Sequence, residues 1–286
     1  MISKVTRKTF KIRPSGRSTD FISPSFGYGC LYNCSYCYMK RHQPTGLSVA
    51  TNTEDILTEI NSHAAFAVVD KPNQTHEKYT TYDISCNEDF ALHAKHHEWE
   101  KIFTFFKDHP DIMGSFATKY VNNKLLSFNP EGKIRIRFSL MPQKMADIHE
   151  PNTSKIIDRI KAINDFIEAG YDVHINFSPV IVTDTWIKDY RELFEGVDAI
   201  VDRKYKNRVK AEVIFLTHNF KKHIVNLESN PETEVDLWVP NIQESKVSQY
   251  GGKNVRYNYK LKREYIKQFV DLHDSVIPWN TIRYIF

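Results

Sequence analysis

Residues 29–38 read Gly-Cys-Leu-Tyr-Asn-Cys-Ser-Tyr-Cys-Tyr, and this stretch is the most informative part of the 286-residue chain. Three of the four cysteines lie within it, at Cys30, Cys34 and Cys37, and the fourth, Cys86, stands alone. A disulfide framework would need an even set of cysteines spread through a short secreted chain. Clustered thiols in a reducing compartment instead indicate a metal site.

The C-x3-C-x2-C spacing separates two kinds of metal site. An iron–sulfur cubane has four irons, and three thiolates leave the fourth iron open to a small ligand. A structural zinc site needs a fourth protein ligand, and the nearest candidates, His42 and Cys86, do not extend the run at a zinc-like spacing. The sequence therefore predicts one [4Fe–4S] cluster on Cys30, Cys34 and Cys37, with a zinc knuckle as the less favoured alternative.

The composition is that of an ordinary folded protein, with 41% hydrophobic and 26% charged residues. No apolar run approaches the roughly 20 residues that span a bilayer, and the basic N-terminal segment lacks the apolar core of a secretory signal. We therefore expect a cytoplasmic protein with no membrane partner. The net charge of +4 permits a nucleic-acid partner without requiring one.

Basic and tyrosine side chains are interleaved near the C-terminus. The candidate nucleic-acid contacts there are Tyr250, Lys253 and Arg256, because basic groups hold phosphates and aromatic rings stack on bases. Composition alone favours a solvated hairpin and helix in the same place.

Short β-rich runs alternate with helical periodicity, which favours an α/β fold with a parallel sheet. The expected strands are 78–85, 113–119, 133–140, 172–182, 211–217 and 282–286, and the expected helices are 53–66, 97–107, 153–169, 186–194, 220–227 and 261–272. These make about six βα units, fewer than the eight of a closed barrel. The polar run 228–234 is the expected exposed loop, dividing a core of residues 1–228 from a basic hairpin and helix of residues 229–286.

The cysteine spacing, with Tyr36 just before the third cysteine, resembles the signature of the radical S-adenosylmethionine superfamily. The resemblance implies a partial (β/α)6 TIM-type barrel with a small C-terminal β-hairpin and helix extension. It also implies that the open iron binds S-adenosylmethionine, and that an electron from a flavodoxin- or ferredoxin-type donor cleaves it to a 5′-deoxyadenosyl radical. Tyr36 occupies the aromatic position that packs near the adenine.

Over most of its length the chain also resembles the spore photoproduct lyase family. The matching segments are 29–38, 85–89, 116–120, 137–142, 153–194, 248–251 and 282–286. Members of that family repair a methylene-bridged thymine dimer in DNA. The resemblance therefore implies DNA or a thymine-derived nucleotide as substrate.

The same resemblance assigns roles to single residues. Cys86 matches the cysteine that returns a hydrogen to the product radical, and Tyr38 matches a tyrosine that relays it. Lys119 and Ser139 match residues that hold the carboxylate and the ribose or amine of S-adenosylmethionine. The structural alternatives are a buried core cysteine, ordinary packing for Tyr38, and a salt bridge from Lys119 to a neighbour such as Asp83 or Glu88.

The chain departs from the family pattern at three positions. Glu88 stands where the family has a small hydroxyl, and Gln249 and Asn219 replace arginines. A divergent member could therefore modify or rearrange a pyrimidine in DNA or a nucleotide without reversing damage. The third alternative is a zinc-bearing nucleic-acid-binding protein without catalysis. In either DNA-acting case we expect base flipping, with the Tyr250 turn as wedge.

His93 and His97 lie one helical turn apart. Because no third ligand follows at a useful spacing, we interpret them as the solvated start of a helix rather than as a metal site.

Overall fold

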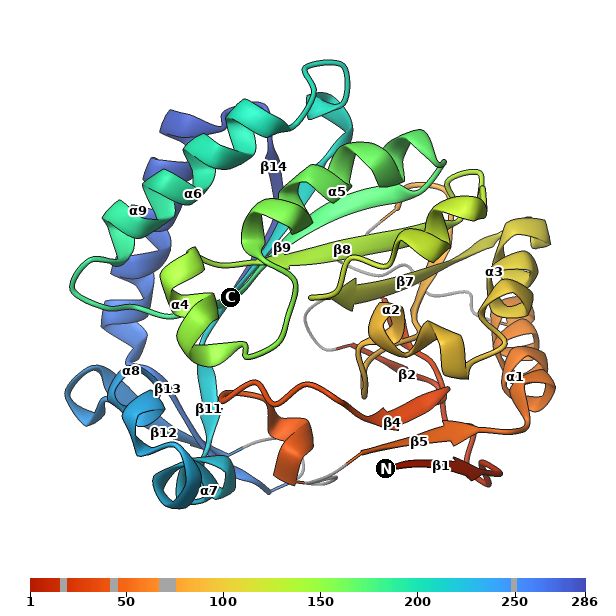
Figure 1. Ribbon diagram of the computed structural model, residues 1–286, viewed down its shortest axis with the longest axis horizontal. Coiled ribbons are helices and arrows are strands. Elements are labelled where there is room, and N and C mark those ends of the chain that lie inside the picture. Colours follow the sequence, from red (N-terminus) through yellow and green to blue (C-terminus); the bar gives the residue numbers. More distant parts are fainter. Residues whose placement is uncertain (16–19, 42–45, 67–75, 248–250) are drawn as a thin grey trace.

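The computed structural model describes residues 1–15, 20–41, 46–66, 76–247 and 251–286. Its centre is an eight-stranded sheet that curls into an open half-barrel (Figure 1). In spatial order the strands are β14 (Thr281–Ile285), β10 (Lys210–Phe215), β9 (Asp172–Val180), β8 (Ile134–Leu140), β7 (Ile112–Thr118), β6 (Thr80–Asp83), β3 (Phe21–Ile22) and β2 (Arg13–Pro14). All neighbours pair in parallel except β2 and β3, which are antiparallel. The expected partial α/β barrel is confirmed.

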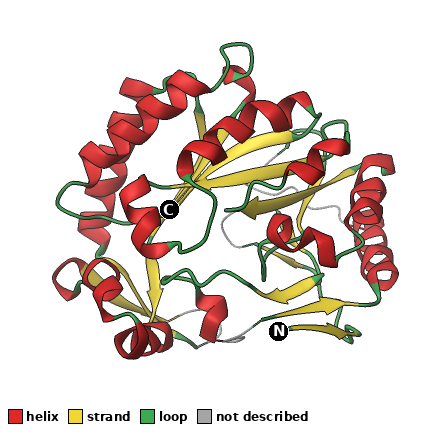
Figure 2. Cartoon of the chain, in the orientation of Figure 1, coloured by secondary structure: helices red, strands yellow, loops and turns green. Residues whose placement is uncertain are grey.

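The longer helices cover the outer face of this sheet (Figure 2). The α-helices are α1 (Thr53–Phe66), α2 (Phe90–His93), α3 (Trp99–Asp108), α4 (Gln143–His149), α5 (Ile156–Glu168), α6 (Trp186–Ile200), α7 (Phe220–Ser229), α8 (Glu234–Leu237) and α9 (Tyr259–Val276). The 3-10 helices are Tyr38–Arg41, Ala94–His96, Asn123–Ser127, Lys206–Arg208, Pro231–Thr233 and Pro240–Ile242. Helix α5 packs its isoleucine-rich side on β8 and β9, as its periodicity predicts. No helix among the described residues has both the length and the apolar character to cross a bilayer.

Two small sheets flank the half-barrel. One contains β1 (Ile2–Val5), β5 (Leu47–Ala50) and β4 (Gly27–Gly29), and the other contains β11 (Thr217–Asn219), β13 (Lys253–Tyr257) and β12 (Gln243–Val247). Strand β4 ends at Gly29, whose φ of 105° is a left-handed conformation that favours glycine. The chain therefore turns sharply from β4 into the cysteine segment.

The inner face of the half-barrel is polar. Along β8, residues at every second position share a face, and Arg135, Arg137 and Ser139 are each at most 5% exposed. Arg137 lies between Asp83 of β6, at 2.9 Å, and Glu212 of β10, at 3.2 Å. The hydrophilic half of the alternating pattern thus faces the interior of the curled sheet, where ion pairs satisfy it.

Residues 229–286 contribute to the main sheet as well as to the small one. Strand β14 pairs with β10, and Phe269 of α9 meets Phe194 of α6 and Phe177 of β9 with ring centroids 5.4 and 5.8 Å apart. A division at residue 228 stays a prediction.

The prediction of an exposed loop over residues 228–234 is wrong at both ends of that range. Helix α7 continues to Ser229, and Thr233 and Glu234 are only 3% and 5% exposed. The reason is that buried donors on neighbouring elements bind the Glu234 carboxylate.

Candidate active site

A cavity of about 340 Å³ opens at the carboxyl ends of strands β6 to β10. This is the end at which parallel α/β barrels carry their reactive groups. Eight residues singled out from the sequence line it together: Cys30, Cys34, Tyr36, Cys37, Tyr38, Cys86, Lys119 and Ser139. Residues that are separated by up to 109 positions in the chain, from Cys30 to Ser139, therefore share one chamber.

The three clustered cysteines lie on a tight loop. The Cys37 amide donates to the Cys34 carbonyl at 3.1 Å, and the Gly29 amide donates to the Asn87 carbonyl at 3.0 Å, next to Cys86. Burial raises the pKa of Cys30 to about 12 and raises the pKa of Cys34 well above its usual range. These two thiols therefore keep their protons unless a cation replaces them. Three thiols that line the wall of one cavity fit an iron–sulfur cluster.

Ser35, in the middle of this loop, is held from two sides. Its carbonyl accepts a hydrogen bond from Asn226 Nδ2 at 2.8 Å. Its hydroxyl lies 2.7 Å from His149 Nδ1, and its amide donates to the His149 carbonyl at 3.0 Å. His149 Nε2 in turn lies 3.1 Å from Asp236. Helices α4, α7 and α8 thus position the loop between the second and third cysteines.

A buried carboxylate organises the next part of the cavity. Glu150 accepts a hydrogen bond from the Tyr36 hydroxyl and lies 2.8 Å from Arg159 and 4.0 Å from Lys119 Nζ. The Lys119 ammonium also lies 5.7 Å from the centre of the Tyr36 ring. Burial disfavours the charged ammonium, but the combined attraction of its negative neighbours, Glu150 foremost, outweighs burial and raises the pKa of Lys119. Lys119 is therefore a fixed positive charge at the cavity wall.

The alternative partners expected for Lys119 were wrong. Asp83 pairs with Arg137 at 2.9 Å. Glu88 binds His93 and His97 at 2.9 and 2.8 Å. Lys119 and Glu150 form a loose pair in their place.

Ser139 lies beside an amide with an unused acceptor. Asn176 Nδ2 approaches the Ser139 hydroxyl at 3.5 Å, and the Ser139 carbonyl accepts from Arg159 at 2.8 Å. Asn176 Oδ1 is buried and has no hydrogen-bond partner among the described residues. A buried amide oxygen without a partner is costly, so this wall suits a ligand hydroxyl or ammonium. This wall, the three thiols and Lys119 together fit an iron–sulfur cluster with S-adenosylmethionine bound to it.

Cys86 lines the same cavity, and its main chain lies next to the end of the cysteine loop. The Tyr38 hydroxyl donates to the Cys86 carbonyl at 2.9 Å. Burial, reinforced by Asp83, raises the pKa of the Cys86 thiol to about 11. Near neutral pH this sulfur keeps its hydrogen. A neutral thiol is the state that can give a hydrogen atom.

The family model for spore photoproduct lyase matches residues 2–286. This chain belongs to the spore photoproduct lyase family. It is therefore a member of a radical S-adenosylmethionine enzyme family, as the cysteine spacing indicates.

Individual relatives agree with this assignment. The spore photoproduct lyase of Bacillus subtilis (strain 168) is 27% identical over 237 residues, which cover 81% of this chain and 66% of the relative. The match therefore spans just under two thirds of that protein. The Clostridium acetobutylicum spore photoproduct lyase is 23% identical over 284 residues, covering 94% of this chain and 80% of the relative.

Solved structures of spore photoproduct lyases share the fold. One, complexed with dinucleoside spore photoproduct, has a TM-score of 0.89 at 22% identity and covers 100% of this chain and 82% of its own. A mutant with bound AdoMet and dinucleoside spore photoproduct has a TM-score of 0.88 at 20% identity, with the same coverage. The half-barrel of this family member is thus the architecture of those proteins.

Sequence reasoning missed the roles of four residues in this family member. Asp83 and Arg137, which form an ion pair, and Asn176 line the cavity, and Glu150 lies next to it. For Arg137 a signal existed, because it lies two residues before Ser139 on a strand with strict alternation. Residues two apart on a strand share a face, so a prediction that Ser139 faces the barrel interior also places Arg137 there.

Two of the three predicted nucleic-acid contacts, Lys253 and Arg256, do not line this cavity. Lys253 is exposed on β13, and the Arg256 guanidinium binds Glu244 at 2.9 Å on the neighbouring strand. Tyr250, Gln249 and His42 lie outside the described residues.

The expected solvated helix start at His93 and His97 is wrong. The His93 side chain is 0% exposed and that of His97 is 2% exposed. The third group that the spacing did not indicate is Glu88, which lies before the helix and binds both imidazoles.

Proposed function

We propose that this protein is a radical S-adenosylmethionine lyase that converts a thymine-dimer photoproduct in DNA back to thymines. One observation carries the proposal: the three-cysteine loop and the Cys86 thiol line a single cavity at the mouth of the half-barrel. A cluster bound on one side and a hydrogen donor on the other would enclose a substrate between them. The dinucleoside spore photoproduct bound by the structural relatives supports the choice of substrate.

The cofactors follow from the same cavity. Cys30, Cys34 and Cys37 would hold a [4Fe–4S] cluster, and Tyr36, Lys119 and Ser139 would hold S-adenosylmethionine. When bound, these groups supply the radical that removes a hydrogen atom from the substrate. Lys119 would pair with the ligand carboxylate in a charge-assisted hydrogen bond. Glu150 orients Lys119 and Tyr36 toward the chamber.

Cys86 would then return a hydrogen atom to the product. After the methylene bridge breaks, a carbon radical remains on one thymine, and transfer of the Cys86 hydrogen leaves a closed-shell thymine and a sulfur radical. Transfer of the Tyr38 hydroxyl hydrogen to that sulfur would restore the thiol and leave a phenoxyl radical on Tyr38, which a hydrogen atom from the methyl group of 5′-deoxyadenosine would quench. The contact of Tyr38 with the Cys86 main chain supports this order of transfer.

The departure at Glu88 does not speak against this substrate. Its carboxylate is 1% exposed and is bound by two histidines. Although Glu88 lines the cavity, both histidines already bind its Oε2, which supports the lyase assignment in spite of this departure.

We further propose that DNA binds across the cavity mouth and that a flavodoxin- or ferredoxin-type protein supplies the electron. The interior position of the cavity supports flipping of the lesion out of the stack. Lys253 and Arg256 stay candidate phosphate contacts, and Tyr250 stays the candidate wedge.

The deciding experiment uses enzyme reconstituted without oxygen to about four irons per chain. It is incubated with S-adenosylmethionine, dithionite and dinucleoside spore photoproduct, and the products are separated by mass spectrometry. We expect recovery of unmodified thymidine, two molecules for each photoproduct consumed. If 5′-deoxyadenosine accumulates while the photoproduct persists, the protein instead modifies another pyrimidine. A single zinc without sulfide would remove radical chemistry altogether.

A further inference from the structure

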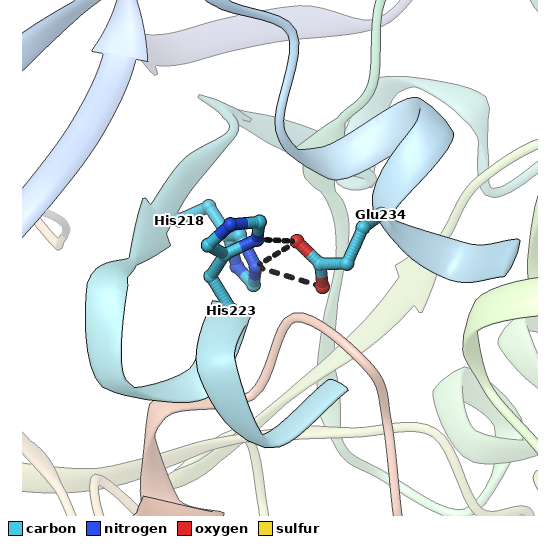
Figure 3. Close-up of side chains that lie close together, drawn as sticks. All are labelled: His218, His223 and Glu234. Carbon is cyan, nitrogen blue, oxygen red and sulfur yellow. Dashed lines mark hydrogen bonds and ion pairs between the residues drawn. The ribbon is translucent and has the colours of Figure 1, made fainter. Parts of the chain in front are cut away.

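A second group of metal-ligating side chains lies outside the cavity. His218 comes from β11, His223 from α7 and Glu234 from the start of α8, and the three side chains converge (Figure 3). One ligand atom from each can be chosen so that all three lie within 4.8 Å of one another. His218 Nε2 is 3.1 Å from both carboxylate oxygens, and His223 Nδ1 is 2.5 Å from Oε2.

The geometry of the triad is fixed by its surroundings. The His218 side chain is 0% exposed and that of Glu234 is 5% exposed. Trp238 stacks on the His223 ring with centroids 4.0 Å apart and an interplanar angle of 13°. Both imidazoles therefore point at the carboxylate before any ion binds, which lowers the cost of ordering ligands.

A comparison within the chain separates this triad from an ordinary hydrogen-bonded cluster. Glu88 also binds two histidines, but there both imidazoles approach the same oxygen, Oε2. His93 Nε2 accepts a hydrogen bond from the Leu31 amide, so its lone pair is already used. Among the described residues, the His218 set alone satisfies the convergence that an ion requires.

The donor set indicates the class of ion. Two imidazole nitrogens and one carboxylate form a zinc-type set that leaves a fourth position open, whereas calcium and magnesium prefer oxygen ligands throughout. The His223 side chain is 12% exposed, so water can reach that edge of the site.

We propose that His218, His223 and Glu234 bind one divalent transition-metal ion of the zinc class, with water completing the coordination. The ion takes the place of the protons that the two imidazoles now share with the carboxylate. As one shared ion, it would join β11, α7 and α8. Because Asn226 binds both Glu234 and the Ser35 carbonyl, the ion would also stabilise the scaffold that supports the cysteine loop.

The test counts metals in the intact enzyme. Protein reconstituted to about four irons is incubated with a slight excess of zinc chloride, passed through a desalting column, and analysed for zinc and iron. We expect about one zinc per chain in addition to the irons, together with a rise in melting temperature. Zinc content no higher than that of the column blank would overturn the proposal.

Two variants locate the ion. His223→Ala and Glu234→Gln should each lower the bound zinc roughly tenfold or more, and the zinc-dependent rise in melting temperature should disappear. His97→Ala is the matched control, because it removes a buried histidine from the Glu88 cluster; it should retain zinc. If His223→Ala and Glu234→Gln both bind zinc as the unchanged protein does, the ion lies elsewhere and the proposal fails. The result does not depend on the substrate of the active site.

Discussion

Asn226 Nδ2 donates a hydrogen bond to the main-chain carbonyl of Ser35 at 2.8 Å, across 191 residues of sequence. Ser35 lies between the second and third cysteines, whereas Asn226 is a buried residue of α7. The C-terminal part of the chain therefore supports the cysteine loop directly. The stability of the loop depends on an element that follows most of the barrel in the sequence.

Asn226→Ala should weaken the loop, because it leaves the buried Ser35 carbonyl without a donor, at a cost of about 1–3 kcal/mol. We expect faster loss of iron to a chelator under anaerobic conditions, followed by the bleaching of the cluster absorbance. Asn164→Ala is the matched control, since Asn164 makes the same kind of bond to the Ile200 carbonyl at 2.9 Å, between α5 and α6. Equal rates of iron loss in the two variants would contradict this role of Asn226.

Lys119→Met should weaken S-adenosylmethionine binding about 10- to 100-fold, the equivalent of one charge-assisted hydrogen bond. Anaerobic titration calorimetry on the reconstituted enzyme measures the dissociation constant. Lys133→Met is the control: that lysine is also buried, but it donates to the His109 carbonyl at the opposite end of the sheet. An unchanged dissociation constant in Lys119→Met would remove Lys119 from the ligand site.

Cys86→Ser should keep the formation of 5′-deoxyadenosine within about twofold, because Cys86 is not one of the three cysteines that would hold the cluster. Thymine recovery should fall, since an O–H bond is stronger than an S–H bond and does not quench a carbon radical. In D2O the unchanged enzyme should place deuterium from the exchangeable Cys86 thiol in the thymine product, and the variant should not. Normal product with normal labelling from Cys86→Ser would exclude this cysteine as donor.

The cluster site could be predicted from the sequence because its three ligands are local. Cys30, Cys34 and Cys37 lie on one loop, so their spacing carries the geometry. Glu150 and Asn226 could not be found in this way, because each reaches the loop over more than 100 residues through the tertiary fold. No local periodicity reports which distant carboxylate or amide will meet a given loop.

The helices and strands were predictable because apolar periodicity is also a local signal. The prediction of exposure failed for polar residues that the tertiary fold buries. The helix at 53–66 and the strand over 133–140 follow the expected apolar periodicity. His93 and Glu234 were expected in solvent because their side chains are polar, yet each is buried with partners from other elements. Composition records that a side chain is polar but not that it is already paired.

Acid should destabilise the protein through His174. Burial lowers the pKa of His174 to about 4, and its Nδ1 lies 2.8 Å from the Arg283 guanidinium, which requires a neutral ring. In the unfolded chain this histidine takes up a proton near pH 6.5. Its contribution to stability is therefore complete above pH 6.5 and is lost as the pH falls from 6.5 toward 4, by about 3 kcal/mol.

Denaturant titrations of cluster-free protein at pH 7 and pH 4.5 measure this loss. His174→Gln keeps a side chain that can accept from Arg283 but does not titrate in this range, so its stability should fall less between the two pH values. Asp20, whose pKa is about 2 because its arginine neighbours outweigh burial, loses its stabilising contribution only below about pH 4. An equal fall in both proteins would show that other groups control the acid response.

Glu88→Thr, which introduces the small hydroxyl typical of the family, should destabilise this chain. Two buried imidazoles, His93 and His97, lose the carboxylate that binds them, at about 1–3 kcal/mol for each unpaired group. Glu88→Gln keeps an acceptor in place and should cost less. We expect the midpoint of denaturant unfolding to fall in the order wild type, Glu88→Gln, Glu88→Thr. A Glu88→Thr variant as stable as the unchanged protein would contradict the pairing.

Gly27 provides the sharper test of the same cluster. A β-carbon at Gly27 would collide with the Glu88 carboxylate, which cannot move aside because both histidines bind it. Gly27→Ala should therefore destabilise the unchanged chain, whereas in a Glu88→Thr background the added methyl group fits the space that the carboxylate leaves. A double-mutant cycle should give a coupling free energy of about 1–3 kcal/mol in favour of the double variant. Strict additivity of the two substitutions would show that Glu88 does not occupy the space beside Gly27.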